Sequence, residues 1–256
     1  MESVLTHIIR TRDLVAGRGW SRPLPGLPFW KRALDLGLIV VFSPVLVSIG
    51  AFVALVIKLG SPGPVLFRQL RVGHKGQKFL CYKFRSMKVD AETDSHRGHT
   101  AHLMKSEVPM TKLDMEHDPR IIPFGTLLRC TGLDELPQLM NVLRGEMSIV
   151  GPRPCIPYEY ESYETWQRKR FDAVPGLTGL WQVSGKNRTT FKQMINLDIE
   201  YSNRASLWLD LKIIFKTLPA LVIQCYDVKI HHSEAEAANL KSEPVSLAKD
   251  ADLASL

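Results

Sequence analysis

The most constraining feature of this sequence is a run of 22 residues, 36–57, that contains no charged side chain. As an α-helix this run is roughly 33 Å long, which is enough to cross a hydrocarbon layer about 30 Å thick. A secretory signal peptide does not fit, because a polar stretch precedes the run and Lys58 follows it. The core helix of a soluble protein is the alternative, but such helices rarely remain uncharged over this length. We therefore expect a membrane helix.

Basic residues flank the run on both sides, and no acidic residue lies between Lys58 and Lys88. The positive-inside rule predicts that both flanks stay in the cytoplasm. Near the middle of the run, Ser43 and Pro44 predict a bend, because proline removes one backbone hydrogen bond and serine can bond the freed carbonyl. We expect residues 29–60 to form a re-entrant helix that enters and leaves the membrane on one face. A kinked helix that crosses completely is the alternative.

The rest of the chain divides by composition. Residues 1–28 form a basic extension, and residues 61–226 mix short strand and helix patterns, which predicts a small soluble domain. Residues 227–256 lack aromatic side chains and predict a disordered tail. The overall expectation is a helix-rich α+β fold. A wholly disordered chain is excluded by 45% hydrophobic residues, and four cysteines without a CxxC pair support neither a disulfide-stapled fold nor a cysteine zinc site.

Shorter segments give further signals. Residues 65–70 and Lys78–Phe84 predict the two strands of a hairpin. The segment 90–118 is polar and aperiodic, which predicts a loop, and its histidines at positions 96, 99 and 102 have no fixed scaffold that would make a metal site. Residues 206–224 predict an amphipathic helix that lies either at the membrane interface or against the core.

Two adjacent acids, Asp134 and Glu135, precede Pro137, which suits the first turn of a helix. The positive end of a helix stabilises carboxylates and attracts phosphates. Because adjacent side chains point in different directions, one acid can attack phosphorus while the other binds a divalent cation. Simple helix capping is the alternative interpretation of an acid pair at this position.

Four cationic side chains favour the chemical interpretation of the acid pair. Lys83 and Arg85 lie at a strand end, Arg129 lies shortly before the acids, and Arg153 lies between two prolines. The prolines restrict the backbone, so this guanidinium can meet a phosphate at a lower entropic cost. Together these cations suit the phosphates of a diphosphate substrate, and beside an apolar anchor they also suit acidic lipid headgroups. Solvated surface side chains are the alternative for each of them.

Six motifs in this order resemble the bacterial sugar transferase family, whose members are monotopic polyprenyl-phosphate phosphoglycosyl transferases. They are KRALD (31–35), SPGP (61–64), KFRSM (83–87), LDELPQ (133–138), MSIVGPRP (147–154) and PGLTGLWQV (175–183). The family's re-entrant helix also bends at a Ser-Pro pair, which Ser43 and Pro44 match. Larger members carry four spanning helices ahead of this region, so the chain resembles the catalytic portion, with residues 61–226 as its catalytic domain.

The resemblance implies roles for individual residues. By position, Asp134 is the nucleophile that forms a covalent aspartyl-phosphosugar intermediate, and Glu135 holds Mg²⁺. Arg153 corresponds to the arginine of the family's Pro-Arg-Pro motif. Asp198 falls where the family has a further functional acid, and we group it with the residues that surround the substrate phosphates.

The implied reaction transfers a sugar 1-phosphate from a UDP-sugar to undecaprenyl phosphate and releases UMP, at the cytoplasmic face of the bacterial inner membrane. It would be the first membrane step of exopolysaccharide, capsule or O-antigen synthesis. The run 181–185 resembles members that use UDP-glucose or UDP-galactose. Membrane lipids are expected partners, nucleic acid is not, and a homo-oligomer stays open. The alternatives are a non-catalytic adaptor that binds acidic lipid, and a glycosyltransferase that releases UDP.

Overall fold

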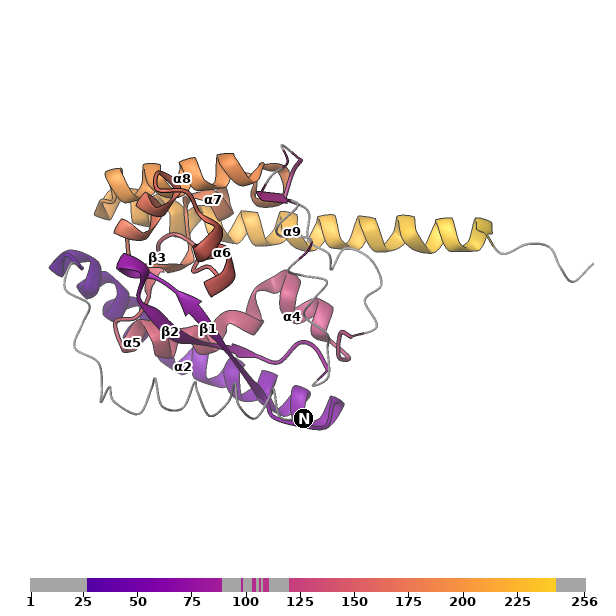
Figure 1. Ribbon diagram of the computed structural model, residues 1–256. Coiled ribbons are helices and arrows are strands. Elements are labelled where there is room, and N and C mark those ends of the chain that lie inside the picture. Colours follow the sequence, from indigo (N-terminus) through magenta and orange to yellow (C-terminus); the bar gives the residue numbers. More distant parts are fainter. Residues whose placement is uncertain are drawn as a thin grey trace, which may run out of the picture.

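The computed structural model describes residues 27–88 and 120–242, with residues 98, 103, 104, 106 and 108–110 between them. Helices dominate, and two small sheets accompany them, which confirms the helix-rich α+β fold (Figure 1). Three sequence-based expectations fall outside the described residues: residues 1–26 of the basic extension, most of the segment 90–118 with its three histidines, and residues 243–256 of the tail.

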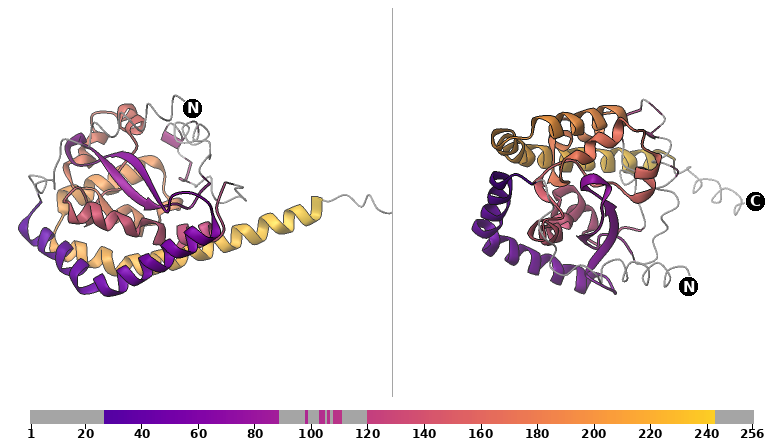
Figure 2. Two further views of the ribbon diagram at one scale, coloured as in Figure 1. Left: turned by 90° about the horizontal axis from the view of Figure 1, so that it is seen from below. Right: turned by 60° about the vertical axis from the view of Figure 1, so that its left-hand side comes forward.

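The long helices are α2 (Phe29–Gly60), α8 (Phe191–Arg204) and α9 (Leu207–Ser242). The short α-helices are α4 (Gly125–Thr131), α5 (Leu139–Leu143), α6 (Pro157–Ser162) and α7 (Leu180–Val183). The 3-10 helices are η1 (His74–Gly76), η3 (Leu133–Gln138), η4 (Gln167–Asp172) and η5 (Lys186–Arg188). The strands are β1 (Leu66–Val72), β2 (Lys78–Phe84), β3 (Ser148–Val150) and β4 (Gly176–Thr178). Helices α8 and α2 lie on opposite sides of the body, with the hairpin and α5 between them (Figures 1 and 2).

Helix α2 leaves most of its apolar surface uncovered. It is long and apolar enough to cross a membrane, and only 11% of its most apolar stretch is buried. Val40 and Val41 are each 70% exposed. A core helix of a soluble protein would bury such side chains, so that alternative is wrong for α2.

Helix α2 changes direction along its length, as the left view of Figure 2 shows. Pro44 lies inside the helix and has no N–H to donate to the carbonyl of Val40. The hydroxyl of Ser43 donates to this same carbonyl at 2.8 Å, and the hydroxyl of Ser48 donates to the carbonyl of Pro44 at 2.8 Å. The serines therefore satisfy backbone groups beside the proline, which lowers the cost of a bend in a hydrocarbon environment.

The predicted hairpin is present, and its register decides which side chains share a face. Strands β1 and β2 pair antiparallel, with Gln69 opposite Cys81 and Phe67 opposite Lys83. Side chains alternate between the two faces of a strand. Gln69, Arg71, Cys81 and Lys83 therefore project from one face of the hairpin.

A second, parallel pair of strands brings two glycine turns together. Ser148 pairs with Gly176 and Val150 with Thr178. A Cβ atom added to Gly176 would lie 2.0 Å from the backbone nitrogen of Gly151, so this approach excludes any side chain at position 176. The pairing places the Gly-Pro-Arg-Pro loop, residues 151–154, beside the chain that leaves β4.

Helix α9 is amphipathic and longer than the sequence predicts. Asp210 and Ile213 are buried, whereas Trp208 and Phe215 are 77% and 76% exposed. One side thus packs on the body, and the other presents large apolar side chains that suit a membrane interface. The helix continues to Ser242, so the expectation of a disordered tail from residue 227 is wrong as far as residue 242. The far end of α9 projects beyond the body of the molecule (Figure 1).

Buried charged side chains attach α2 to the body. The amine of Lys31 lies 2.5 Å from the Asp210 carboxylate and donates to the Tyr201 hydroxyl at 2.9 Å. Asp35, one turn further along α2, accepts from the Ser148 hydroxyl and the Ile149 N–H, each at 3.0 Å. Residues 31–35 are one of the motifs that resemble the family, and their polar contacts in this structure reach β3, α5, α8 and α9.

We expect Asp210→Ala to lower the free energy of unfolding by about 3–5 kcal/mol, because it leaves Lys31 as a buried charge without its carboxylate. Denaturant titration of the detergent-solubilised protein measures this loss. Glu200→Ala, which breaks an exposed pair with Arg204, is the matched control and should cost less than about 1 kcal/mol. Equal stability of the two variants would contradict the assigned role of the buried pair.

Candidate active site

The acid pair lies in the first turn of η3. Gly132, with φ of 72°, separates α4 from this turn, and Gly145, with φ of 77°, follows α5. Both glycines occupy the left-handed region that other residues avoid. The sequence predicts acids ahead of an α-helix, whereas the structure places them inside a 3-10 helix that continues into α5. Asp134 is 9% exposed, and the Glu135 side chain is 23% exposed.

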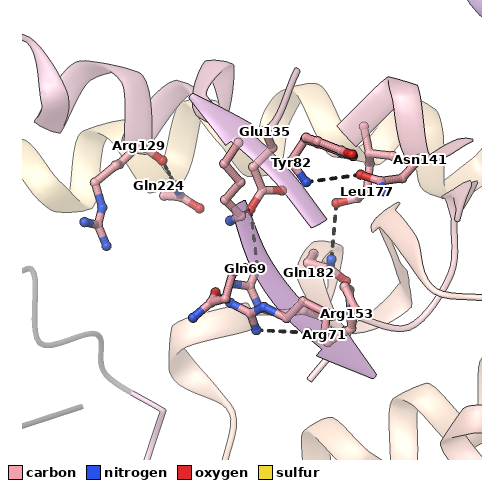
Figure 3. Close-up of polar contacts among 12 residues, drawn as sticks. Gln69, Arg71, Tyr82, Arg129, Glu135, Asn141, Arg153, Leu177, Gln182 and Gln224 are labelled. Carbon is pink, nitrogen blue, oxygen red and sulfur yellow. Dashed lines mark hydrogen bonds and ion pairs between the residues drawn. The ribbon is translucent and has the colours of Figure 1, made fainter. Parts of the chain in front are cut away.

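Two cations converge on one oxygen of Glu135. The amine of Lys83 lies 2.7 Å from Glu135 Oε1, and Arg153 Nη1 lies 3.5 Å from the same oxygen. Lys83 comes from β2, Arg153 from the loop after β3, and Glu135 from η3, so three separate segments meet here. Figure 3 shows Arg153 reaching toward the Glu135 carboxylate.

These cations determine the ionisation of Glu135. Burial alone would raise the pKa of Glu135, but the positive charges of Lys83 and Arg153 outweigh it and hold the pKa well below its ordinary value. The side chain is therefore a carboxylate across the neutral range. The stability that its ion pairs contribute is present above about pH 4.5 and is lost only as the pH falls below that value.

A pocket opens beside Glu135. Its lining combines cationic, polar and small residues: Arg71, Cys81, Lys83, Glu135, Gln138, Arg153, Pro154, Gly176 and Leu177. One carboxylate thus faces three cations in this pocket. Asp134 is not part of the lining. It precedes Glu135 directly in the same turn and is largely covered.

A buried ion pair fixes the loop that carries Arg153. Arg170 is 2% exposed, and its Nη2 atom lies 2.5 Å from the Asp198 carboxylate. The same nitrogen donates to the backbone carbonyl of Arg153 at 2.9 Å, and Nη1 donates to the Tyr163 hydroxyl at 2.7 Å. Arg170 thus fixes the backbone carbonyl of Arg153, while the Arg153 side chain lines the pocket.

Comparison with known proteins shows which family contains these residues. Residues 27–224 match the family model described as bacterial sugar transferase. The chain belongs to the bacterial sugar transferase family. The match includes the acid pair, the Gly-Pro-Arg-Pro loop and β4, so the pocket lies entirely within the family region.

Individual relatives of this family differ in length. The chain is 37% identical over 205 residues to the exopolysaccharide production protein ExoY of Sinorhizobium fredii, covering 80% of this chain and 90% of the relative. It is 39% identical over 212 residues to the UDP-glucose:undecaprenyl-phosphate glucose-1-phosphate transferase of Escherichia coli K12, covering 78% and 42%. It is 45% identical over 162 residues to the galactosyl transferase CpsE of Streptococcus agalactiae, covering 63% and 35%. The chain therefore spans less than half the length of the last two.

Two residues predicted to bind phosphate have other partners. Arg85 is buried, and its guanidinium donates to the carbonyls of Pro62 at 2.6 Å and Ser61 at 2.9 Å. It ties the end of α2 to the end of β2 and does not line the pocket, so a contact between Arg85 and substrate phosphates stays a prediction. Asp198 is fully buried against Arg170 and does not line the pocket, so its expected contact with substrate phosphates also stays a prediction.

Arg129 also lies apart from the pocket. It belongs to α4, and its backbone carbonyl accepts a hydrogen bond from Gln224 of α9 at 3.0 Å. Figure 3 shows its guanidinium pointing away from Glu135. Of the predicted phosphate-binding residues, the structure thus brings Lys83 and Arg153 to Glu135, and it places Arg85, Arg129 and Asp198 elsewhere.

The sequence-based reasoning missed Arg71, Gln138 and the residues of β4 in the lining. The hairpin pattern in the sequence could have indicated Arg71. With Gly73 to Gly76 as the turn, the strand pairing puts Arg71 on the same face as Lys83. Gly176 and Leu177 reach the pocket through the parallel pairing of β3 with β4. A local sequence pattern cannot predict such a long-range contact.

Glu135 has the chemistry of a magnesium ligand. Its carboxylate is ionised, and Lys83 and Arg153 both contact Oε1, while no hydrogen bond or ion pair from the described residues reaches Oε2. Among residues 27–88 and 120–242, no group of three or more His, Cys, Asp or Glu could hold a metal ion. Mg²⁺ commonly binds one or two carboxylates together with substrate phosphates, and Glu135 fits that mode.

We expect Asp198→Ala to lower the free energy of unfolding by about 3–5 kcal/mol and to accelerate hydrogen exchange of the Gly151 and Arg153 amides, because Arg170 loses its carboxylate. Denaturant titration and hydrogen-exchange mass spectrometry measure the two effects. Asp172→Ala, which breaks the exposed Lys75 pair, is the control and should change neither. Unchanged exchange in the loop of Asp198→Ala would show that the buried pair does not hold Arg153.

Proposed function

We propose that the chain transfers a sugar 1-phosphate from a UDP-sugar to undecaprenyl phosphate and releases UMP. The observation that supports it is the Glu135 carboxylate between Lys83 and Arg153, next to Asp134, in a chain of the bacterial sugar transferase family. The name of the Escherichia coli relative supports a UDP-glucose donor and an undecaprenyl-phosphate acceptor. The ExoY name supports a place in exopolysaccharide production.

The proposed reaction has two displacements at one phosphorus atom. An oxygen of Asp134 attacks the phosphorus next to the sugar, and the bond from this phosphorus to the bridging oxygen breaks. UMP leaves with the bridging oxygen, and an aspartyl-phosphosugar remains. A phosphate oxygen of undecaprenyl phosphate then attacks the same phosphorus, and the Asp134 carboxylate is released. The product is a lipid-linked diphosphate sugar.

The charged side chains stabilise the phosphates during these steps. Lys83 and Arg153 already lie beside the acids, and they can exchange part of their contact with Glu135 for phosphate oxygens when substrate enters. Mg²⁺ bound at Glu135 would neutralise charge on the diphosphate. The limited exposure of Asp134 keeps its carboxylate away from bulk water, which disfavours hydrolysis of the intermediate.

The membrane helix would bring this centre to the lipid substrate. A polyprenyl chain cannot leave the bilayer at a cost of about 0.8 kcal/mol per exposed CH₂ group, so the enzyme must work at the membrane surface. The bend at Ser43 and Pro44 supports a re-entrant α2, and the basic flanks support an active site on the cytoplasmic face of the inner membrane. The exposed apolar side chains of α9 support the same placement.

The reaction is tested with purified protein, undecaprenyl phosphate and a panel of UDP-sugars. We expect UMP as the nucleotide product with at least one sugar. Asp134→Asn and Glu135→Gln should each reduce UMP release by about a thousandfold or more, because each removes a group that acts on the reacting phosphate. Glu161→Gln, at an exposed position, is the matched control and should keep full activity.

Three results would contradict the proposal. UDP as the product would indicate transfer of the sugar without its phosphate. No nucleotide release from any UDP-sugar, together with unchanged lipid binding by Asp134→Asn, would indicate a non-catalytic adaptor. Full activity of Asp134→Asn would exclude Asp134 as the nucleophile.

The topology of α2 is tested by cysteine labelling. Phe29 and Leu59 lie near the two ends of the helix and are 89% and 79% exposed. We expect Phe29→Cys and Leu59→Cys, each in a Cys225→Ser background, to be protected from a membrane-impermeant thiol reagent in intact spheroplasts and labelled after lysis. Labelling of one of the two positions before lysis would show that α2 crosses the membrane.

A further inference from the structure

Arg71 lines the pocket, and only some of its N–H groups bond to the described residues. It belongs to β1 and projects from the hairpin face that also carries Lys83. Its Nη2 donates to the Gln69 side-chain oxygen at 2.6 Å, and its Nη1 donates to the Pro154 carbonyl at 3.2 Å. Figure 3 shows Arg71 and Arg153 close to each other, with Glu135 above them.

The Arg71 guanidinium has N–H groups that make no hydrogen bond to the described residues. Arginine carries five N–H groups in a planar fork, and the two hydrogen bonds above use two of them. The Nε atom of Arg71 is buried and has no hydrogen-bond partner among the described residues. A buried donor without a partner is costly, and a bound anion that accepts from this side chain would remove that cost.

The charge around Arg71 is unbalanced. The pocket lining contains Arg71, Lys83 and Arg153 but only one carboxylate, Glu135, which gives the lining a net charge of +2. Lys83 and Arg153 contact Glu135, whereas the two contacts of Arg71 are to uncharged groups. Burial and the adjacent charge of Arg153 both lower the pKa of Arg71, and the charge of Glu159 offsets them only in part.

We propose that Arg71 is a substrate-binding residue that donates hydrogen bonds to a phosphate oxygen of the nucleotide-sugar diphosphate. The inference rests on the proposed function, because that function supplies a diphosphate. A sugar nucleotide carries one negative charge on each of its two phosphates, so a lining with excess positive charge suits it. Arg71 also holds Pro154, so binding of the diphosphate would fasten the hairpin to the Arg153 loop.

The direct test is binding of inorganic pyrophosphate and of inorganic phosphate to the detergent-solubilised full chain, measured by isothermal titration calorimetry without acceptor lipid. We expect Arg71→Gln to weaken pyrophosphate binding about 10- to 100-fold and phosphate binding much less, because the smaller anion can be held by Lys83 and Arg153. Arg71→Lys keeps the charge but loses the fork, and it should lie between Arg71→Gln and the unaltered protein.

The matched control is Arg68→Gln. Arg68 is an exposed arginine of the same strand on the opposite hairpin face, where it lies over the Tyr82 ring. Its substitution should leave both affinities within about twofold. If Arg71→Gln does not fold, Arg71→Lys, which keeps the long side chain, provides the comparison.

Two results would overturn the inference. Pyrophosphate affinity that is absent in the unaltered protein or unchanged in both Arg71 variants would remove Arg71 as an anion-binding residue. An equal loss of pyrophosphate and phosphate binding would show that Arg71 only positions Pro154.

Failure of the proposed function gives a different pattern. If Arg71-dependent pyrophosphate binding is present but no UDP-sugar releases UMP, the anion site stands and the transferase reaction fails. If UMP is released and Arg71→Gln has an unchanged KM for the UDP-sugar, only the role of Arg71 fails.

Discussion

The buried contacts of Lys31 and Asp35 connect the long apolar helix α2 to the rest of the molecule. Lys31 meets Asp210 and Tyr201, and Asp35 receives hydrogen bonds from Ser148 and Ile149. These two β3 residues lie just ahead of the Gly-Pro-Arg-Pro loop, so the apolar helix and the pocket share one rigid strand. A buried charge is costly unless it is paired or hydrogen-bonded, so this attachment depends on these particular partners.

The pocket also contains charged side chains, but here they do not balance one another. Its lining holds more positive than negative charge, and the excess is exposed to a cavity instead of being neutralised by the fold. Lys83 and Arg153 keep Glu135 ionised through one oxygen, and no hydrogen bond or ion pair from the part of the chain that the structure describes reaches the other. A site with surplus cations and an accessible carboxylate oxygen is suited to a diphosphate that arrives with a divalent cation.

Local patterns were sufficient for the apolar helix, the hairpin and the acid pair, and they were insufficient for the pocket. The apolar run, the hairpin and the acid pair follow from periodicity and turn residues, all of which act over short distances along the chain. The fate of a charged side chain depends on distant partners. Arg85 donates hydrogen bonds to the carbonyls of Ser61 and Pro62, and Asp198 pairs with Arg170. Neither side chain lines the pocket. The continuation of α9 past residue 227 also escaped composition, because a polar, alanine-rich stretch can extend an existing helix.

The most direct test of the account is whether Asp134 carries the sugar phosphate. The protein is incubated with a UDP-sugar that supports UMP release, without undecaprenyl phosphate, then quenched, digested and analysed by mass spectrometry. The account predicts a mass increase equal to one sugar phosphate on the peptide that contains Asp134, and its loss when the acceptor lipid is added before quenching. An enzyme that releases UMP in the presence of acceptor but never carries this mass on that peptide would contradict it.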